Sequence, residues 1–326
     1  MAVTDYTKLR SANSFAAPYL MNELETNLKM FFDWGFLGIG GWSDVNIPTT
    51  GAFGGTLHIL QPVYDPSYDD GQVWQTFRKD WVWETGVGYL DSTSNPDPTR
   101  ITGVKVDGAF YGSGDVTYGW HVNYPLGRVI FDTAVATTSD VELNYSYRFV
   151  QIYRADDAPW WTELQYQSFR ADDSHFSQFG TGDWSIGAQH RVQMPAIVVE
   201  AVPRGSAGGY ELGNGALEVE QDVLFHVLAE NRFDRNNLLD IIRLQQDNII
   251  WLFNSQSVAE ATGYPLDYRG MVVGSNMYPD LVGSGNGYRW QECRFKDSII
   301  AEVESLNPNL YQGVIRTTLE VIIGNI

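Results

Sequence analysis

The sequence predicts an α+β fold: an N-terminal helix and an antiparallel sheet with one crossing helix, interrupted by a large inserted all-β domain. Three observations predict it. A helical apolar pattern comes first, short aromatic and β-branched runs between turn residues follow, and long strand patterns with one helical stripe end the chain. Antiparallel strands with helices to one side are typical of α+β layer folds. We expect residues 1–40 and 191–326 to form the α+β domain and residues 41–190 to form the inserted β-rich domain.

The N-terminal helix is predicted from apolar residues at three- and four-residue steps. They are Leu20, Leu24, Leu28, Phe31 and Phe32. Asn13 or Ser14 can cap its start, and Gly35 suits the left-handed position at which helices end. An amphipathic helix of this kind must pack against another part of the protein.

The inserted segment is expected to be all-β because turn residues separate short strand-like runs. Residues 104–111 predict a hairpin, since Asp107 and Gly108 at its centre suit the positive φ angles of a type I′ turn. Residues 128–131 and 141–147 predict a second pair of strands, joined by a Thr- and Ser-rich loop.

Two expectations concern the limits of this segment. The strand-like residues 149–153 are expected to continue the same sheet. Residues 40–72 hold little pattern, which predicts a long, partly ordered loop.

The last third of the chain predicts four strands. Residues 196–202 are a short apolar run, typical of a buried strand, that Pro203 is expected to end. After a Gly-rich loop, residues 217–229 alternate like a strand with one buried face. The final strands are predicted around residues 290–304 and over residues 313–323.

A helix is predicted between these strand pairs. Asp234 suits its N-cap position, and the apolar stripe consists of Leu238, Ile241, Ile242 and Ile249. The Gly- and Ser-rich residues 283–287 lack the Lys-Ser/Thr of a phosphate-binding loop, which favours a plain hairpin loop.

Charge and composition exclude several classes of protein. The 326 residues contain 21 Lys and Arg against 40 Asp and Glu, a formal net charge of −19. A protein that grips nucleic acid is disfavoured, because no basic surface is available to displace counterions from phosphates. The single cysteine, Cys293, excludes a disulfide framework and a Cys-rich metal site. No apolar run reaches the roughly 18–20 residues of a membrane span, and residues 1–6 lack signal-peptide features, so we expect a cytosolic protein.

The sequence lacks the common motifs that indicate catalysis or cofactor binding. It has no nucleophile elbow, Walker loop or dinucleotide fingerprint, and its histidines show no i, i+4 pairing. We expect the histidines to be single polar or partly buried residues; they are His58, His121, His175, His190 and His226. Cys293 is expected to be a small buried apolar residue. We therefore assign no catalytic residue, no cofactor-binding residue, no metal ligand and no cofactor.

The stretch 154–173 supports an alternative function. It contains two copies of Arg-Ala-Asp-Asp, at residues 154–157 and 170–173, on either side of Trp160 and Trp161. Carboxylates beside tryptophans are typical of a glycosidase or a carbohydrate-binding cleft. The structural interpretation is favoured: the acidic pair ends a strand, and a short helix begins at the proline that follows.

Two further stretches are candidate binding sites. Residues 65–71 are acidic but depart from the calcium-binding EF-hand pattern, so a solvated turn is favoured. Trp74, Trp81 and Trp83 interleave with the basic residues 78–79, which suits a protein interface better than a single-stranded nucleic-acid platform in so acidic a chain.

The whole chain resembles virion structural proteins of contractile-tailed phages, particularly those that infect marine cyanobacteria. The segments that carry the resemblance are strand, helix and turn segments rather than catalytic motifs; they are residues 19–24, 31–35, 122–131, 145–148, 194–200 and 223–231. The C-terminal part looks like tail-completion and tail-terminator proteins, whose element order residues 195–247 match. The large insertion departs from compact terminators, which leaves neck, terminator and other adaptor positions open.

The resemblance implies a non-enzymatic protein at the head–tail neck, a tail terminator or connector. It implies a homo-oligomeric ring, expected to be hexameric, that contacts neck, tail-tube or sheath proteins in a virion assembled in the host cytoplasm. Genomic DNA would pass through its lumen without specific binding, which the acidic charge suits. A baseplate or tail-fibre component is a further alternative. Loops 203–215 and 262–289 are expected to contact partners, and strand 217–229 to carry part of the oligomer surface.

Overall fold

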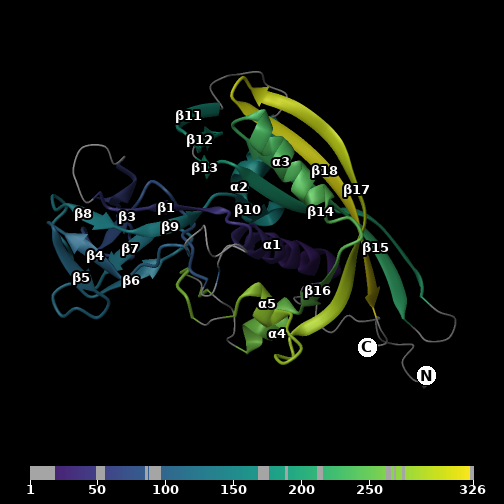
Figure 1. The fold of residues 1–326 in the computed structure, drawn as a ribbon, viewed down its shortest axis with the longest axis horizontal. Helices are drawn as coiled ribbons and strands as arrows, with labels where there is room; N and C mark the ends of the chain where they lie inside the picture. Colours follow the sequence, from purple (N-terminus) through teal and green to yellow (C-terminus); the bar gives the residue numbers. More distant parts are fainter. Residues whose placement is uncertain are drawn as a thin grey trace.

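The protein has two lobes in this computed structural model. The described residues are 19–48, 56–84, 87, 97–167, 176–187, 190–210, 216–261, 266–267, 269–273 and 276–323. Within them the chain is an α+β protein made mostly of strands, which confirms the predicted fold class at this level. Figure 1 shows a β-rich lobe of short strands and a sheet lobe, in which a long curved sheet packs with helices.

The sheet lobe is built on a six-stranded sheet with the order β10-β14-β15-β18-β17-β16. Its strands are β10 (Gln151–Arg154), β14 (Ala196–Gly209), β15 (Leu217–Ala229), β16 (Ile249–Phe253), β17 (Arg289–Asn307) and β18 (Leu310–Ile323). Neighbouring strands are antiparallel except β10 and β14, which are parallel. The β15–β18 pairing has no register shift over the whole of β15, so these two strands form the regular centre of the sheet.

Two helices, α1 (Leu20–Gly38) and α3 (Arg232–Arg243), cover one face of this sheet. Side chains alternate along a strand, so the odd-numbered residues 223, 225 and 227 of β15 share that face. The core there includes Leu24, Leu28, Phe32, Val223, Phe225, Val227, Leu238, Leu239, Ile242, Ile315 and Leu319. Gly313 of β18 lets α3 approach closely, since a Cβ atom at this position would lie 2.6 Å from Leu239 Cδ1.

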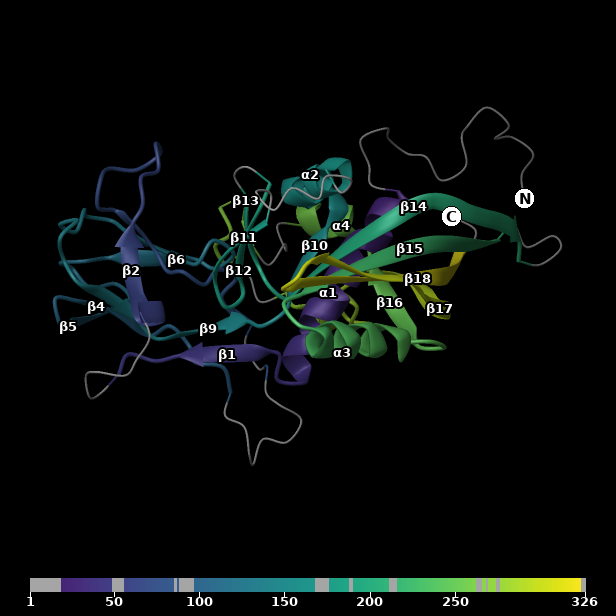
Figure 2. The same cartoon turned by 90° about the horizontal axis from the view of Figure 1, so that it is seen from above.

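The opposite face is partly covered by the short helix α2 (Pro159–Gln167) and a three-stranded sheet, as Figure 2 shows for α2. The small sheet consists of β11 (Phe176–Gly180), β12 (Asp183–Ile186) and β13 (His190–Gln193), and the single turn η3 (Ala155–Asp157) precedes α2. A second core forms between these elements and the long sheet; its members include Trp160, Trp161, Trp184, Val192, Val198 and Leu228.

The β-rich lobe has a seven-stranded antiparallel sheet with the order β5-β4-β8-β2-β3-β7-β6. Its strands are β2 (Ile59–Pro62), β3 (Val73–Gln75), β4 (Gly103–Val106), β5 (Ala109–Gly112), β6 (Trp120–Asn123), β7 (Arg128–Phe131) and β8 (Val141–Leu143). A separate ladder pairs β1 (Trp42–Val45) with β9 (Tyr145–Arg148), and η2 (Thr56–His58) precedes β2. Trp81 and Tyr145 are fully buried at its centre, with ring centroids 4.7 Å apart.

Two short helices, α4 (Ser255–Glu260) and α5 (Tyr278–Leu281), complete the sheet lobe near the middle of α1. The buried Asn27 side chain donates to the Phe253 carbonyl at 3.0 Å and accepts from the Phe253 N–H at 2.8 Å. Ser255 Oγ donates to the Glu23 carboxylate at 2.8 Å. These contacts extend the hydrogen bonding of β16 onto α1 and orient the helix on the sheet.

Several predicted elements are confirmed. Residues 104–111 form the β4–β5 hairpin, and its turn residues Asp107 and Gly108 have positive φ angles of 51° and 81°. The strand predicted over residues 217–229 is β15 with the same limits. The two last predicted strands are β17 and β18, each longer than expected by a few residues.

The predicted end of the N-terminal helix was wrong. The helix passes Gly35 and ends at Gly38, because its last turn buries Phe36 and Leu37. Gly40, with a φ of 83°, takes the left-handed position after the helix. The caps proposed at Asn13 and Ser14 lie outside the described residues.

Strand pairing in the inserted segment also differs from the prediction. The strands at 128–131 and 141–147 do not pair, since β7 lies between β3 and β6 while β8 lies between β2 and β4. Residues 149–153 do not continue that sheet, because β10 pairs with β14 in the sheet lobe. Residues 40–72 hold β1, η2 and β2 rather than one long loop.

Three corrections concern the last third. Pro203 does not end its strand: β14 continues to Gly209 past a register shift between Ala201 and Gly205, so much of the predicted loop 203–215 is strand. The missing N–H of Pro203 costs no ladder bond there, because residues 202–204 form no ladder pair with β15 and β10 pairs only with the first four residues of β14. Residues 283–287 do not form a hairpin loop, because they connect α5 to β17.

The helix cap was assigned to the wrong residue. Asn231 caps α3, and its side chain accepts from the Asp234 N–H at 2.8 Å. Ile249 belongs to β16, since the chain turns at Asp247, which has a φ of 64°. We expect Asn231→Ala to lower the free energy of unfolding by about 1 kcal/mol, measured by urea denaturation, because the orphan N–H loses its partner. An unchanged stability would contradict this role.

The two lobes share chain segments. β10, α2 and β11–β13 all lie within the predicted insertion 41–190, yet they pack on the six-stranded sheet. The domain boundaries at residues 40 and 190 stay a prediction.

Candidate functional site

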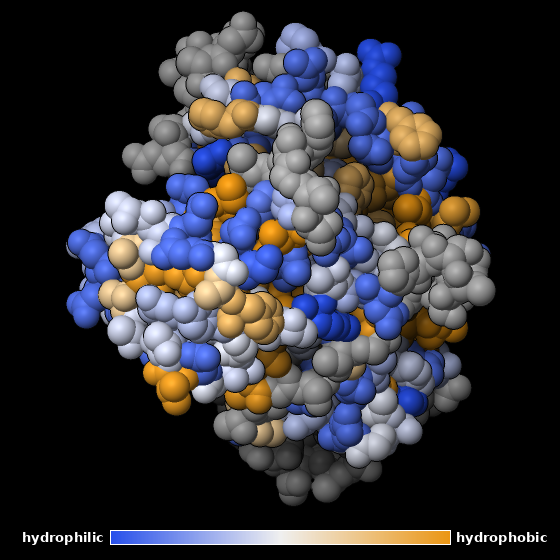
Figure 3. Space-filling view, turned by 60° about the vertical axis from the view of Figure 1, so that its left-hand side comes forward, coloured by the Kyte–Doolittle hydropathy of each residue, from blue (hydrophilic) through white to orange (hydrophobic). Residues whose placement is uncertain are grey.

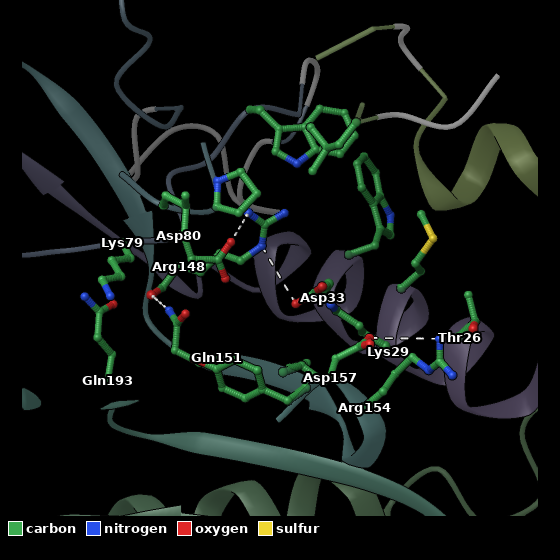
Figure 4. A pocket seen from close by; sticks show the side chains of 18 of the residues that line it. Thr26, Lys29, Asp33, Lys79, Asp80, Arg148, Gln151, Arg154, Asp157 and Gln193 are labelled. Carbon is green, nitrogen blue, oxygen red and sulfur yellow. Dashed lines mark hydrogen bonds and ion pairs between the residues drawn. The ribbon is translucent and has the colours of Figure 1, made fainter. Parts of the chain in front are cut away.

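A pocket of about 600 Å³ lies where α1, the β-rich lobe and the β10–α2 segment meet (Figure 4). Its walls come from α1, residues 79–84, the β6–β7 turn, β9, β10, α2, β13 and α5. Segments more than 200 residues apart in the sequence therefore meet at one place, as α1 and Tyr278 of α5 do.

A buried arginine lies in the wall of this pocket. Arg148 of β9 is 5% exposed, and its guanidinium pairs with Glu84, with Asp80 at 3.4 Å and with Asp33 at 3.8 Å. It also donates to the Trp81 carbonyl at 3.3 Å. Asp33 belongs to α1, whereas Asp80 and Glu84 belong to the β-rich lobe, so this cluster ties the two lobes together.

The cluster contains more negative than positive charge. Burial raises the pKa of Asp33 to about 7, although Arg148 acts in the opposite direction. Burial also raises the pKa of Glu84. Burial opposes the charge of Arg148 as well, but its three carboxylate neighbours raise its pKa above the ordinary value. The arginine therefore stays charged while the carboxylates share the cost of desolvation.

The pocket is also unusually basic for so acidic a chain. Five basic side chains line it: Lys29, Lys79, Arg148, Arg154 and Arg191. Arg154 pairs with Glu25 at 3.5 Å, and Arg191 pairs with Asp183. Burial lowers the pKa of Lys79, and the nearby Arg128 and Arg191 lower it further. Aromatic rings form much of the remaining wall; they belong to Trp34, Trp83, Tyr153, Trp160 and Tyr278.

A second surface of interest is the free edge of β17. Among the described strands, β16 pairs only with its first residues, 289–294, and the backbone of Phe295 still bonds to Asp247 and Asn248 just before β16. Residues 296–307 pair on one side alone, with β18. This stretch carries exposed apolar side chains: Ile299 is 46% exposed, Ile300 36% and Val303 49%. Phe233 at the start of the neighbouring α3 is 72% exposed.

Among its described residues, the β-rich lobe presents no comparable row of exposed apolar side chains. Among the residues that Figure 3 colours, apolar side chains lie in small separate groups between polar ones. Exposed apolar residues of the β-rich lobe, such as Tyr64, Phe110 and Val116, are scattered over different turns and strands. Scattered apolar residues of this kind are normal for a protein surface.

The described histidines each face one carboxylate. His58 lies 3.3 Å from Glu142, His121 lies 3.9 Å from Asp132, His190 lies 3.3 Å from Glu163, and His226 lies 2.9 Å from Glu200. None of them joins a metal-binding group within the described chain. This confirms the expectation of single polar or partly buried histidines for these four; His175 lies outside the described residues.

Cys293 is confirmed as a buried small apolar residue. It is 0% exposed in the core between the sheet and its helices, and burial raises the pKa of its thiol to about 12. A thiol with so high a pKa is not a nucleophile at neutral pH.

In its described part, the stretch considered for carbohydrate binding folds as the structural interpretation predicts. β10 ends at Arg154, a single turn follows, and α2 begins at Pro159. Arg154 lies 4.0 Å from Asp156 and 3.9 Å from Asp157. Trp160 and Trp161 are 5% and 3% exposed, so they do not present the open ring planes of a sugar cleft. The second acidic copy, 170–173, lies outside the described residues.

The other candidate stretches also have structural roles. Trp74 and Trp81 are 1% and 0% exposed and belong to the core of the β-rich lobe, so they form no open stacking platform. Asp65 accepts from the Ser67 N–H at 3.0 Å and pairs with Arg128 at 3.1 Å. The acidic turn is therefore held by protein contacts.

One acidic group was not expected from the sequence. Glu218, Glu220 and Glu320 lie together on β15 and β18, and they are the one group of possible metal ligands within the described residues. Lys296 pairs with Glu220 and lies 3.5 Å from Glu320, so a protein cation already neutralises part of this charge.

The Arg148 cluster and the pocket were missed by sequence reasoning. Asp33, Asp80 and Arg148 come from three distant segments, and no spacing rule connects them. The available signal was the low number of basic residues, which makes each arginine in a strand a candidate for a specific partner.

Comparisons with known proteins add no family. No protein-family model matches the chain, and a search of curated proteins finds no match. Within the described residues, no helix combines the length and apolarity that crossing a membrane requires.

Proposed function

We propose that this chain is a non-enzymatic structural protein of a contractile-tailed phage virion, a tail terminator or connector at the head–tail neck, that forms a homo-oligomeric ring around the DNA channel. The proposal starts from the resemblance of its segments to such proteins. The element order supports a tail-terminator-like domain, since α1, β14, β15 and α3 follow one another around a mainly antiparallel sheet. The single observation that carries the oligomer is the free edge of β17.

An exposed strand edge with apolar side chains is a surface that favours pairing. Ile299 lies opposite Arg316 and Ile300 lies opposite Ile315, so the two isoleucines point to opposite faces of the sheet. Between the charged residues Asp297 and Glu302 the strand is therefore apolar on both faces, which is typical of a strand segment that is buried on both sides. An apolar segment left open on a strand edge would promote uncontrolled association. An ordered partner along β17 satisfies both its backbone groups and its side chains.

The second copy of this chain has a suitable edge. In the described sheet, β10 covers residues 196–199 of β14, and the Ala201 N–H donates to the Glu25 carboxylate of α1 at 2.8 Å, which leaves residues 202–209 without a second neighbouring strand. The strands alternate in direction from β14 to β17, so β14 of one copy can join β17 of the next as an antiparallel neighbour. Two different edges that meet head to tail make a heterologous contact, and such contacts generate rings when the rotation closes.

The charge of the sheet suits a channel for DNA. The face opposite α1 and α3 carries more carboxylates than cations: it has Glu200, Glu218, Glu220, Asp222, Glu292 and Glu320 against Arg204, Arg294, Lys296 and Arg316. If this face lines the lumen, the excess of carboxylates prevents DNA from adhering to the wall. A ring whose lumen is neutral or basic would contradict this part of the proposal.

The oligomer is tested with the full chain by size-exclusion chromatography with light scattering. We expect a multiple of the 36.7 kDa chain mass, and we expect Val303→Lys to shift the population toward the monomer because a charge would be buried in the contact. Val116→Lys is the matched control, since Val116 is fully exposed on the β-rich lobe. A Val303→Lys protein that assembles like the wild type would overturn the edge contact.

The position in the virion is tested by cryo-electron microscopy of intact particles that contain this chain. Density for the six-stranded sheet as a ring at the junction of head and tail supports the proposal. Density for this chain in the baseplate, in a tail fibre or outside the particle excludes it.

A further inference from the structure

We propose that the pocket between the lobes binds a small organic anion that carries a flat apolar ring, such as an aromatic carboxylate or phosphate. The observations that support this site are independent of the proposed virion function. Its volume of about 600 Å³ falls within the range of small-molecule sites, roughly 300–1,000 Å³. Part of its lining lies on elements that the buried cores fix in place: Ile152, Trp160 and Tyr278 are themselves core residues, and α1 carries core residues along the same helix. The pocket is therefore formed before any ligand arrives.

The cationic side of the pocket provides the charge for an anion. Lys79 has no ion pair within 4 Å among the described residues, and Arg191 lies on the same side of the pocket. Figure 4 shows Lys79 beside Gln193, away from the Arg148 cluster. Lys29 of α1 lies across the pocket, near Asp33, and it also forms no close ion pair in the described part of the chain. An anion placed near Lys79 would relieve the mutual repulsion of these cations.

The carboxylates of the pocket do not favour a cationic ligand. Asp33, Asp80 and Glu84 are already directed at the guanidinium of Arg148. The fourth carboxylate, Asp157, lies 3.9 Å from Arg154. The acidic side chains of the pocket are therefore paired with arginines, whereas Lys29 and Lys79 have no ion-pair partner among the described residues.

Two of the residues that line the pocket contain buried polar atoms without a hydrogen-bond partner. Gln193 is 6% exposed; its amide nitrogen donates to the Phe77 carbonyl at 3.1 Å, whereas its Oε1 has no partner. Trp160 is 5% exposed, and its indole N–H has no partner either. Buried polar groups without partners are costly and rare, and each of these two gains a partner when its side chain turns toward a ligand in the pocket.

The aromatic wall provides the site for the ring. Trp34 and Trp83 line the pocket together with Met30, Leu126 and Tyr278. Aromatic and thioether side chains pack favourably on a flat apolar ring. A ligand with both an anionic group and a ring therefore matches both parts of the wall.

The test uses two fluorescent probes that share one ring system. 1-Anilinonaphthalene-8-sulfonate carries a sulfonate, and N-phenyl-1-naphthylamine is its neutral counterpart. We expect one sulfonate probe to bind per chain, at least roughly tenfold more tightly than the neutral probe. Lys79→Met should abolish this difference while leaving the neutral probe bound. Lys29→Met, on α1, is the second variant and should reduce the difference.

A lysine outside the pocket provides the control. Lys105→Met removes a lysine from β4, outside the pocket, and should leave both affinities unchanged. Thermal melting establishes that each variant is folded. Absence of sulfonate binding, equal affinities for the two probes, several equivalent sites, or a Lys79→Met variant that keeps the difference would each overturn the proposal.

Discussion

Replacing Arg148 with methionine is expected to lower the free energy of unfolding by about 3–5 kcal/mol, as removal of one partner from a buried charge cluster does. The 5% exposed guanidinium is the counter-charge of Asp33, Asp80 and Glu84. Without it, these carboxylates must be ionised without compensation or take up protons. Chemical denaturation at neutral pH, followed by tryptophan fluorescence, measures the loss.

Two further variants separate charge from packing. Arg243→Met removes an arginine whose ion pair with Asp240 is half exposed on both sides, and it should change stability by about 0.5 kcal/mol or less. Adding Glu84→Gln to Arg148→Met should restore part of the lost stability, because one uncompensated charge is removed. A double variant no more stable than Arg148→Met would show that the loss comes from packing alone.

The free energy of unfolding should fall as the pH rises from about 5 to 8, with a contribution from Asp33 on the order of 2 kcal/mol. The folded-state pKa of Asp33 is raised from 3.8 to about 7, so the folded protein holds a proton that the unfolded chain releases at lower pH. The stabilisation is therefore fully present below the unfolded-state pKa of 3.8 and is lost progressively until the pH has risen through the folded-state pKa of about 7. Glu84, whose pKa is also raised by burial, acts in the same direction.

The comparison with a variant isolates this contribution. Other groups also titrate in this range; His121, whose pKa burial lowers, acts in the opposite direction. Asp33→Asn removes one titrating carboxyl of similar shape, so its stability should depend less on pH and exceed that of the wild type at pH 8. Asp70→Asn, on an exposed turn, is the matched control and should follow the wild-type curve. Parallel curves for wild type and Asp33→Asn would refute this assignment.

Local patterns in the sequence predicted local structure well. Asp107-Gly108 specified the turn of the β4–β5 hairpin, because only a few residue types tolerate positive φ angles at both turn positions. Alternation over residues 217–229 predicted β15, since one buried face imposes a period of two. The burial of Cys293 was predicted from its place on a predicted strand without any nucleophile motif, because free cysteines are usually small buried apolar residues.

Pairing between distant segments was not predictable in the same way. β10 was assigned to the wrong sheet because the sequence of a four-residue strand carries no information about its partner. Gly35 looked like a helix end, but the burial of Phe36 and Leu37 outweighs its low helix propensity. The cap at Asn231 was misplaced because Asn and Asp are nearly equivalent N-caps.

The sequence by itself determined the α+β class, the acidic charge, several strands and turns, and the absence of local catalytic motifs, because these depend on composition and on neighbours along the chain. The tertiary structure decided which strands pair, which edges of the sheet stay free and which charges meet around Arg148. The physical reason is that desolvation and ion pairing act between residues that are close in space. Only the folded chain brings Asp33, Asp80 and Arg148 together and encloses the pocket beside them.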